Sequence, residues 1–323
     1  MMFGLMDALI CQSGNVALGR TKSVALWAAI GLLAACAAPI PPPTGPGPAG
    51  EVRGRWRQQA HWIPMQEADG TPRLLYAHVC RPEGDVPAPV AVINHGTGIT
   101  RQIVTAPDCT DEHVQWFLRR GYVAVAPLRR GFGATGGAHS ENLAVGPQGI
   151  RRCDDVNPYL QAREAARDIA ATVDYATALP YARPDGAVVI GASTGGYASI
   201  AYASLPNPKA SAIINVSGGT GGRIGGGLGQ VCHADRLVEA AGRFGATART
   251  PMLWVYSVND SFFSPDLARS MLDAFTAAGG KAELAVVRRF EFDGHALFSA
   301  IGGSQVWGPE VERYLAQRRE GGP

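Results

Sequence analysis

The feature that most constrains the fold is an alternation of short apolar runs with longer helix-like stretches along most of the chain. The apolar runs, such as residues 89–94 and 187–190, are rich in β-branched residues and bounded by turn residues, which is typical of buried strands. The stretches between them space their apolar residues as helices do. The alternation predicts a mostly parallel sheet with helices on both faces.

This pattern predicts eight strands and six helices. The strands are expected at 52–65, 73–80, 89–94, 122–126, 187–190, 210–216, 252–256 and 282–287. The helices are expected at 110–121, 158–179, 194–205, 233–242, 265–278 and 305–315. The first two strands form a hairpin with Asp69 and Gly70 in its turn, which adds an antiparallel edge to the sheet.

The size of the chain fits one large α/β domain. The 323 residues are 46% hydrophobic, and a single α/β domain commonly reaches about 200–250 residues. We expect this domain at 51–323. A formal net charge of +2, without a cluster of basic and aromatic residues, argues against a nucleic-acid partner.

The N-terminal segment, residues 1–36, is predicted to direct export. Arg20 and Lys22 precede an apolar run that is too short for an ordinary transmembrane helix. The run ends at Cys36 in a sequence that resembles the bacterial lipobox, and this resemblance implies lipidation of Cys36 and anchoring to a membrane by lipid alone. Ala37 after it favours the outer membrane, facing the periplasm. The alternative is a plain secretory signal with a chance cysteine.

Residues 37–50 are dominated by Pro and Gly and are predicted to be a semi-stiff linker. In an exported protein, the four cysteines that follow the linker favour disulfides. The expected topology places Cys80 at the bottom of the sheet and the others in loops at its top, so we expect Cys109 to pair with Cys153. Cys232 competes for either partner.

A Gly-x-Ser-x-Gly sequence around Ser193 lies between a predicted strand and a predicted helix. In that setting the serine occupies a strained turn, and Gly191 and Gly195 let neighbouring backbone approach. The helix that begins after it favours negative charge developing at the serine. We therefore predict that Ser193 is a nucleophile.

Three other motifs follow predicted strands. They are His95-Gly96-Thr97, Asn259-Asp260 and Asp293-Gly294-His295. In this order, together with the serine motif, they resemble the α/β-hydrolase superfamily, specifically its branch of dienelactone hydrolases and relatives of prolyl oligopeptidase. The resemblance covers about 88–315 and implies neither cofactor nor metal. Dienelactone hydrolases often have a cysteine nucleophile, so Ser193 leaves lactone hydrolysis in doubt.

The resemblance implies a role for each motif. The chain order Ser193, Asp260, His295 is that of a nucleophile, an acid that orients the base, and the base in this fold. Backbone N–H groups of Thr97 and Thr194 form the oxyanion hole. We interpret other candidates as structural: His95 fixes its loop, Asp266 belongs to a helix start, and Asp293 is too near His295 to orient it.

Other residues are candidates for substrate contacts. The glycine-rich segment 129–137, after the strand 122–126, resembles a loop of the same relatives. Its two arginines, Arg129 and Arg130, either bind a substrate carboxylate or support the loop through salt bridges. Tyr197, Phe262 and Phe263 either line an apolar pocket or pack in the core. No pair of the remaining histidines has convincing spacing for a metal site.

These observations predict a serine hydrolase that cleaves small carboxylic esters through an acyl-enzyme. Activity is expected to fall below about pH 6.5 as His295 is protonated. Two alternatives remain open at this point: a peptidase of the same fold, and a catalytically silent envelope lipoprotein that binds a ligand. The sequence does not reveal an oligomeric state.

Overall fold

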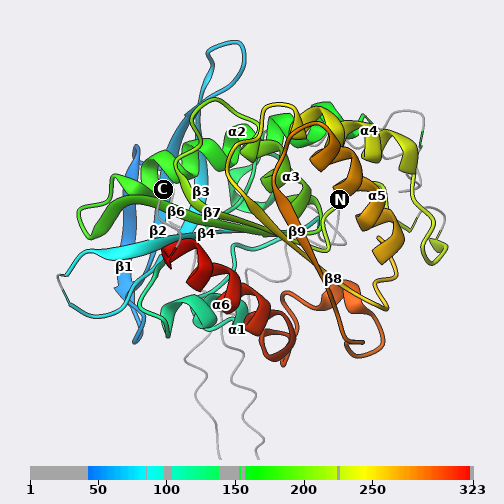
Figure 1. The fold of residues 1–323 in the computed structure, drawn as a ribbon. Coiled ribbons are helices and arrows are strands. Elements are labelled where there is room, and N and C mark those ends of the chain that lie inside the picture. Colours follow the sequence, from blue (N-terminus) through cyan, green and yellow to red (C-terminus); the bar gives the residue numbers. More distant parts are fainter. Residues whose placement is uncertain are drawn as a thin grey trace, which may run out of the picture. The chain divides into compact units, whose positions relative to one another are not determined.

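The computed structural model describes residues 43–84, 86–97, 104–137, 153, 157–223 and 226–320. The predicted export segment with Cys36, and the first part of the predicted linker, lie outside these ranges. Figure 1 shows the fold as a layered arrangement of one sheet between helices.

Within the described residues the sheet has nine strands, in the order β1-β2-β3-β5-β4-β6-β7-β8-β9. The strands β1, β2, β3 and β5 are paired antiparallel, and all pairs from β5 to β9 along the sheet are parallel. Their bounds are β1 Gly47–Arg53, β2 Gln58–Gln66, β3 Pro72–Cys80, β4 Ala88–Asn94, β5 Val123–Pro127, β6 Ala182–Ala192, β7 Ala210–Val216, β8 Met252–Ser257 and β9 Ala282–Val287.

The prediction of eight strands is wrong by one at the N-terminal edge. The stretch predicted as a single strand at 52–65 turns back between β1 and β2, where Gly54 and Arg57 have φ values of 63° and 45°. Strand β1 also begins at Gly47, inside the predicted linker. The predicted hairpin between β2 and β3 is confirmed, with Gly70 at φ 84° in its turn.

The helices lie in two layers. Figure 1 shows α2, α3, α4 and α5 on one face of the sheet and α1 and α6 on the other. Their bounds are α1 Glu112–Leu118, α2 Pro158–Thr177, α3 Thr194–Ala203, α4 Ala234–Gly245, α5 Pro265–Ala277 and α6 Ser304–Glu320. None of the helices in the described ranges has the length and apolar character needed to cross a membrane.

Strand β4 shows why the central strands are continuously apolar. Val90 and Val92 pack in the cluster that includes α2 to α5, whereas Ala91 and Ile93 pack in the cluster that includes α1 and α6. All four side chains are fully buried. A strand buried on both faces has no solvent side to alternate with, which confirms the reading of these runs as parallel core strands.

The predicted Cys109–Cys153 disulfide is wrong. The structure instead has the disulfides Cys80–Cys109 and Cys153–Cys232. Helix α1 has only seven residues, or about 10 Å in length at 1.5 Å per residue. The chain therefore crosses part of the distance from the top of the sheet to its bottom before the helix begins. Cys109 therefore lies low, where its backbone N–H donates to Gln58 of β2, and meets Cys80.

Candidate active site

Ser193 lies in the turn between β6 and α3, with φ 54° and ψ −124°. This strained conformation is tolerated because neighbouring glycines allow close backbone contacts. A Cβ at Gly191 would lie 2.3 Å from the carbonyl oxygen of Gly195, and one at Gly195 would lie 2.4 Å from that of His95. The turn thus projects the Ser193 hydroxyl above the carboxyl end of the central strands.

The structure brings Ser193, His295 and Asp260 together. His295 Nε2 lies 3.1 Å from Ser193 Oγ, and His295 Nδ1 lies 3.0 Å and 3.2 Å from the two carboxylate oxygens of Asp260. The Asp260 side chain is fully buried, and 14% of the His295 side chain is exposed. Backbone N–H groups of Phe262 and Phe263 also donate to Asp260 Oδ1, so the carboxylate is held in one orientation toward the imidazole.

Asn259 joins the loop of Asp260 to the loop of His295. Its side-chain amide donates to the carbonyl of Phe290 and accepts from the Phe290 backbone N–H, while its own carbonyl accepts from the N–H of Gly294. A Cβ at Gly294 would lie 2.5 Å from Ser257 Cβ. Glycine is required there because the two loops are in direct contact.

Asp293 builds the short 3-10 turn that carries His295. Its carboxylate accepts from the backbone N–H groups of Ser261 and His295 and from the Ser261 hydroxyl. Partial burial acts to raise the pKa of Asp293, but these hydrogen bonds hold it below its usual range. The structure thus gives Asp293 a backbone-supporting position, while Asp260 faces the imidazole, as the sequence predicted.

The loop after β4 approaches Ser193 closely. A Cβ at Gly96 would lie 3.0 Å from Ser193 Cβ and 3.6 Å from Ser193 Oγ. The hydroxyls of Thr97 and Thr194, the two predicted oxyanion residues, lie 3.0 Å apart and share a hydrogen bond. The structure therefore places both residues beside the nucleophile.

His95 and Arg129 support this loop from behind. The backbone N–H of Arg129 donates to His95 Nε2, which leaves His95 Nδ1 to donate to the carbonyl of Gly96. In a trans peptide the carbonyl and the next N–H point in opposite directions, so this bond turns the Thr97 N–H away from the His95 ring. The reading of His95 as a loop-fixing residue agrees with these contacts.

The sequence suggested Arg129 as a substrate contact or loop support, but not the connection that it makes. Its side chain is fully buried, and its guanidinium donates to the carbonyl of His95 and to the hydroxyl of Thr194. It thereby connects the two segments that carry the predicted oxyanion donors. The signal in the sequence that could have indicated this role was the position of Arg129 just after the buried strand β5, which is next to β4 in the sheet.

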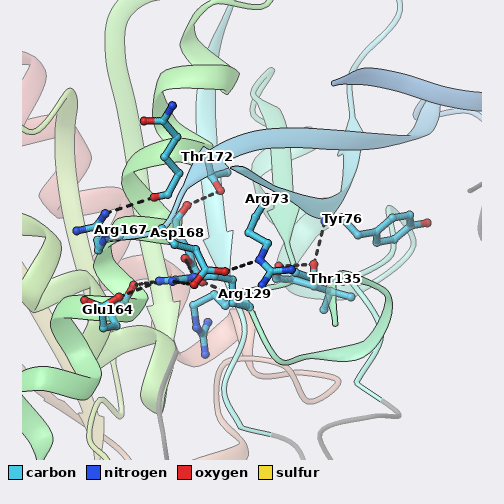
Figure 2. Close-up of polar contacts among 12 residues, drawn as sticks. Arg73, Tyr76, Arg129, Thr135, Glu164, Arg167, Asp168 and Thr172 are labelled. Carbon is cyan, nitrogen blue, oxygen red and sulfur yellow. Dashed lines mark hydrogen bonds and ion pairs between the residues drawn. The ribbon is translucent and has the colours of Figure 1, made fainter. Parts of the chain in front are cut away.

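Arg130 does not belong to the candidate site, so its prediction as a substrate contact is wrong. Its backbone N–H and its Nε donate to Asp168 at 2.8 Å and 2.7 Å, and its Nη2 reaches Glu164. Figure 2 shows Asp168 and Glu164 of α2 turned toward the segment that contains Arg129. Burial acts to raise the pKa of Asp168, while Arg130 acts in the opposite direction. Arg130 is the salt-bridged loop support that the sequence left as an alternative.

Tyr197 is also a core residue rather than a pocket residue. Its side chain is 1% exposed, and its hydroxyl donates to the carbonyl of Leu237 in α4. Burial raises its pKa well above the usual value. The prediction that Tyr197 lines a pocket is wrong because α3 turns this residue toward α4.

Phe262 and Phe263 lie beside His295. The Phe262 ring stacks on the imidazole with centroids 4.0 Å apart, and the buried Phe263 ring meets it edge-on at 5.5 Å. Both rings thus contact the imidazole itself, and no described contact shows them lining an open pocket. Across the described ranges, no cluster of three His, Cys, Asp or Glu side chains is arranged to hold a metal ion.

Comparisons with known proteins bear on the fold and on part of the candidate site. A family described as X-Pro dipeptidyl-peptidase (S15 family) matches residues 69–225, which is less than half of the chain and contains Ser193 but neither Asp260 nor His295. No curated protein matches the chain.

Solved structures with low sequence identity share the fold. A protein assigned as a dienelactone hydrolase from Klebsiella pneumoniae has a TM-score of 0.50 and 17% identity over 81% of this chain and 98% of its own. Acetyl xylan esterase 1 from a Thermoanaerobacterium species has a TM-score of 0.56 and 13% identity over 83% and 86%. An acylaminoacyl peptidase has a TM-score of 0.51 and 18% identity over 74% and 38%. With the parallel sheet and the serine turn, these likenesses show that the chain has the α/β-hydrolase fold.

Proposed function

We propose that the protein is a serine hydrolase that cleaves small carboxylic esters. The observation that carries this proposal is the unbroken chain of hydrogen-bond distances from Asp260 through His295 to Ser193. A serine hydroxyl is a weak nucleophile by itself and needs an adjacent base whose tautomer is fixed by a third group. In this protein all three groups follow strands of the same sheet, at the carboxyl ends of those strands.

In the proposed reaction His295 Nε2 takes the proton of Ser193 Oγ while the hydroxyl attacks the ester carbonyl. Asp260 accepts from His295 Nδ1 and stabilises the imidazolium that forms. His295 then donates the proton to the leaving alcohol, which leaves an acyl group on Ser193. Water attacks the acyl-enzyme by the same steps and releases the acid.

The backbone N–H groups of Thr97 and Thr194 are the proposed oxyanion donors. Two features support this assignment: Thr194 is the first residue of α3, where the helix N–H groups lack partners, and Thr97 is in the loop that touches Ser193. Loss of one such donor typically costs about 10² to 10³ in rate.

A peptidase of the same fold is the second candidate, and the match to the X-Pro dipeptidyl-peptidase family favours it. The same three side chains can also form an acyl-enzyme on Ser193 when the substrate is an amide. The two functions differ in the kind of substrate that is bound well. A comparison of ester and amide substrates therefore distinguishes them.

The test is a parallel panel of p-nitrophenyl esters of varied acyl chain and of aminoacyl and X-Pro p-nitroanilides. The proposal expects kcat/KM for the best ester to exceed that for the best anilide, and Ser193→Ala to abolish both. Faster cleavage of X-Pro anilides would favour the peptidase. Turnover that survives Ser193→Ala would contradict both candidates.

We also propose that the protein is exported and anchored by lipid at Cys36. The two disulfides are consistent with an oxidising compartment, and the lipobox-like sequence supplies the modification site. The test is metabolic labelling with a fatty acid in cells that express the full chain or Cys36→Ser. Lipid label on the wild type alone is expected, and equal labelling of both would contradict the proposal.

A further inference from the structure

The Phe262 ring has two neighbours that carry or can acquire positive charge. On one face the His295 imidazole is stacked at 4.0 Å between centroids and 22° between planes. The Arg223 guanidinium carbon lies 5.1 Å from the centroid of the same ring. The Phe262 ring is therefore stacked on the imidazole and also lies within cation–π distance of the guanidinium.

The main chain of Phe262 is held by the candidate site itself. The Phe262 N–H donates to Asp260 Oδ1 at 2.9 Å, the same oxygen that lies 3.0 Å from His295 Nδ1. A Cβ at Gly222 would lie 3.0 Å from Phe262 Cδ1, so the glycine-rich segment that carries Arg223 packs directly on the ring. The backbone hydrogen bond holds the base of the side chain beside Asp260, and this segment limits the rotation of the ring.

An aromatic face carries negative electrostatic potential and attracts a cation placed over it. The imidazole of His295 becomes such a cation each time it accepts the Ser193 proton. A guanidinium near the same ring acts in the opposite sense, because it repels that developing charge.

In the part of the chain that the structure describes, the other charged groups that contact His295 are carboxylates. Asp260 faces its Nδ1, and Asp293 accepts from its backbone N–H. Asp293 Oδ2 also lies 3.8 Å from Arg223 Nη1 and offsets part of its charge. Among the described contacts of Phe262, Arg223 is the cationic side chain, and about a third of it is exposed.

We propose that Phe262 is a positioning residue for the catalytic base: its ring holds the plane of the imidazole and stabilises the imidazolium, and the positive charge of Arg223 beside the same ring moderates this effect. This inference rests on the proposed function for its catalytic meaning. It assigns Phe262 to the support of the base rather than to the substrate pocket.

The experiment compares Phe262→Leu, Phe262→Tyr and Arg223→Met with the wild type. Leucine keeps apolar volume but removes the aromatic face, tyrosine keeps the face, and methionine keeps much of the stem of Arg223 without its charge. The first readout is the pH titration of the His295 Cε1–H resonance by NMR, assigned with His295→Gln. The second is the pH dependence of Ser193 labelling by a fluorophosphonate.

Phe262→Leu is expected to move the titration midpoint of His295 down by about half a pH unit and to slow labelling about three-fold. Arg223→Met is expected to move the midpoint up, and Phe262→Tyr to restore wild-type values. The matched control is Tyr159→Leu, because Tyr159 stacks on Phe244 at 5.1 Å under Arg243 at 3.5 Å in a similar array on α2 and α4. It should leave both readouts unchanged.

Shifts in the same direction for Phe262→Leu and Arg223→Met, or none in either, would overturn the proposal. If Phe262→Leu does not fold, the upward shift in Arg223→Met still decides the role of the charge. A wild type that is not labelled at Ser193 would contradict the proposed function, whereas the NMR titration would still test the effect of the ring on His295.

Discussion

Gly195 offers a sharp test of how the serine turn and the oxyanion loop depend on each other. It is the second residue of α3, and alanine in a helix is ordinarily more stable than glycine by about 0.5–1 kcal/mol. Here a Cβ would lie 2.4 Å from the carbonyl oxygen of His95 and 2.6 Å from that of Asn94. The space that alanine needs is already filled by the backbone of the loop after β4.

The structure sets the size of the effect. Real Cβ contacts are not found below 3.0 Å, so the loop and the helix must separate from 2.4 Å to at least 3.0 Å, or by about 0.6 Å. That movement displaces the Thr97 segment relative to Ser193. Since a misplacement of 1 Å can cost about 10²-fold in rate, Gly195→Ala is expected to lower kcat by about 10- to 10²-fold with a smaller change in KM.

The assay is steady-state hydrolysis of the best p-nitrophenyl ester by Gly195→Ala, with urea unfolding measured alongside. Gly242→Ala in α4 is the matched control, because a Cβ there meets its nearest neighbour at 3.4 Å, an ordinary contact. This control should keep wild-type kcat and gain a little stability. A wild-type kcat for Gly195→Ala would refute the reasoning.

Three other features of the structure carry predictions of their own. Asp260→Asn should keep the fold but lower kcat by about 10⁴, because an amide in place of the buried carboxylate favours the wrong imidazole tautomer; a change below ten-fold would count against Asp260. Replacing Cys80 and Cys109 by Ala should lower the free energy of unfolding by about 3–4 kcal/mol, measured in urea, since the bond closes a separation of 29 residues; unchanged stability would show that the bond does not form. Burial lowers the pKa of His61 to about 4, so the unfolded state takes up a proton at a higher pH than the folded state does. The free energy of unfolding should therefore have its full value above about pH 6.5 and decrease as the pH drops toward 4. His61→Phe should remove about 3 kcal/mol of that pH dependence, and an unaltered profile would contradict it.

The architecture was predictable because its signals are local. Strands buried on both faces give continuous apolar runs, and β7 and β9 were expected at the bounds that the structure has. The N-terminal edge was not predictable in the same way, because a turn at Gly54 to Arg57 within a polar stretch carries little hydrophobic pattern. Pairing with β2, a tertiary interaction, decides that β1 is a strand.

The three central site residues were predictable from the order of motifs after strands. Their supports were less so, since they depend on which loops touch. Asn259 and Arg129 act through backbone carbonyls far away in sequence, and nothing in the local sequence marks those partners. The disulfides were mispredicted because the path of the loop before α1 determines which cysteines meet.

The candidate pocket residues show the same limit. Arg130 and Tyr197 follow strands whose carboxyl ends lie at the candidate site. Their side chains, however, turn toward α2 and α4. Side-chain direction depends on the packing of the helices. Sequence position alone placed both residues near the site and could not give their orientation.

The most direct test of the central claim is the site and rate of fluorophosphonate labelling, read by peptide mass spectrometry. The folded wild type should be labelled at Ser193, while Ser193→Ala should take no label and His295→Ala should be labelled far more slowly, in keeping with a hydroxyl 3.1 Å from its base. A wild type that stays unlabelled at Ser193, or labelling that is indifferent to His295, would contradict the proposed catalytic site.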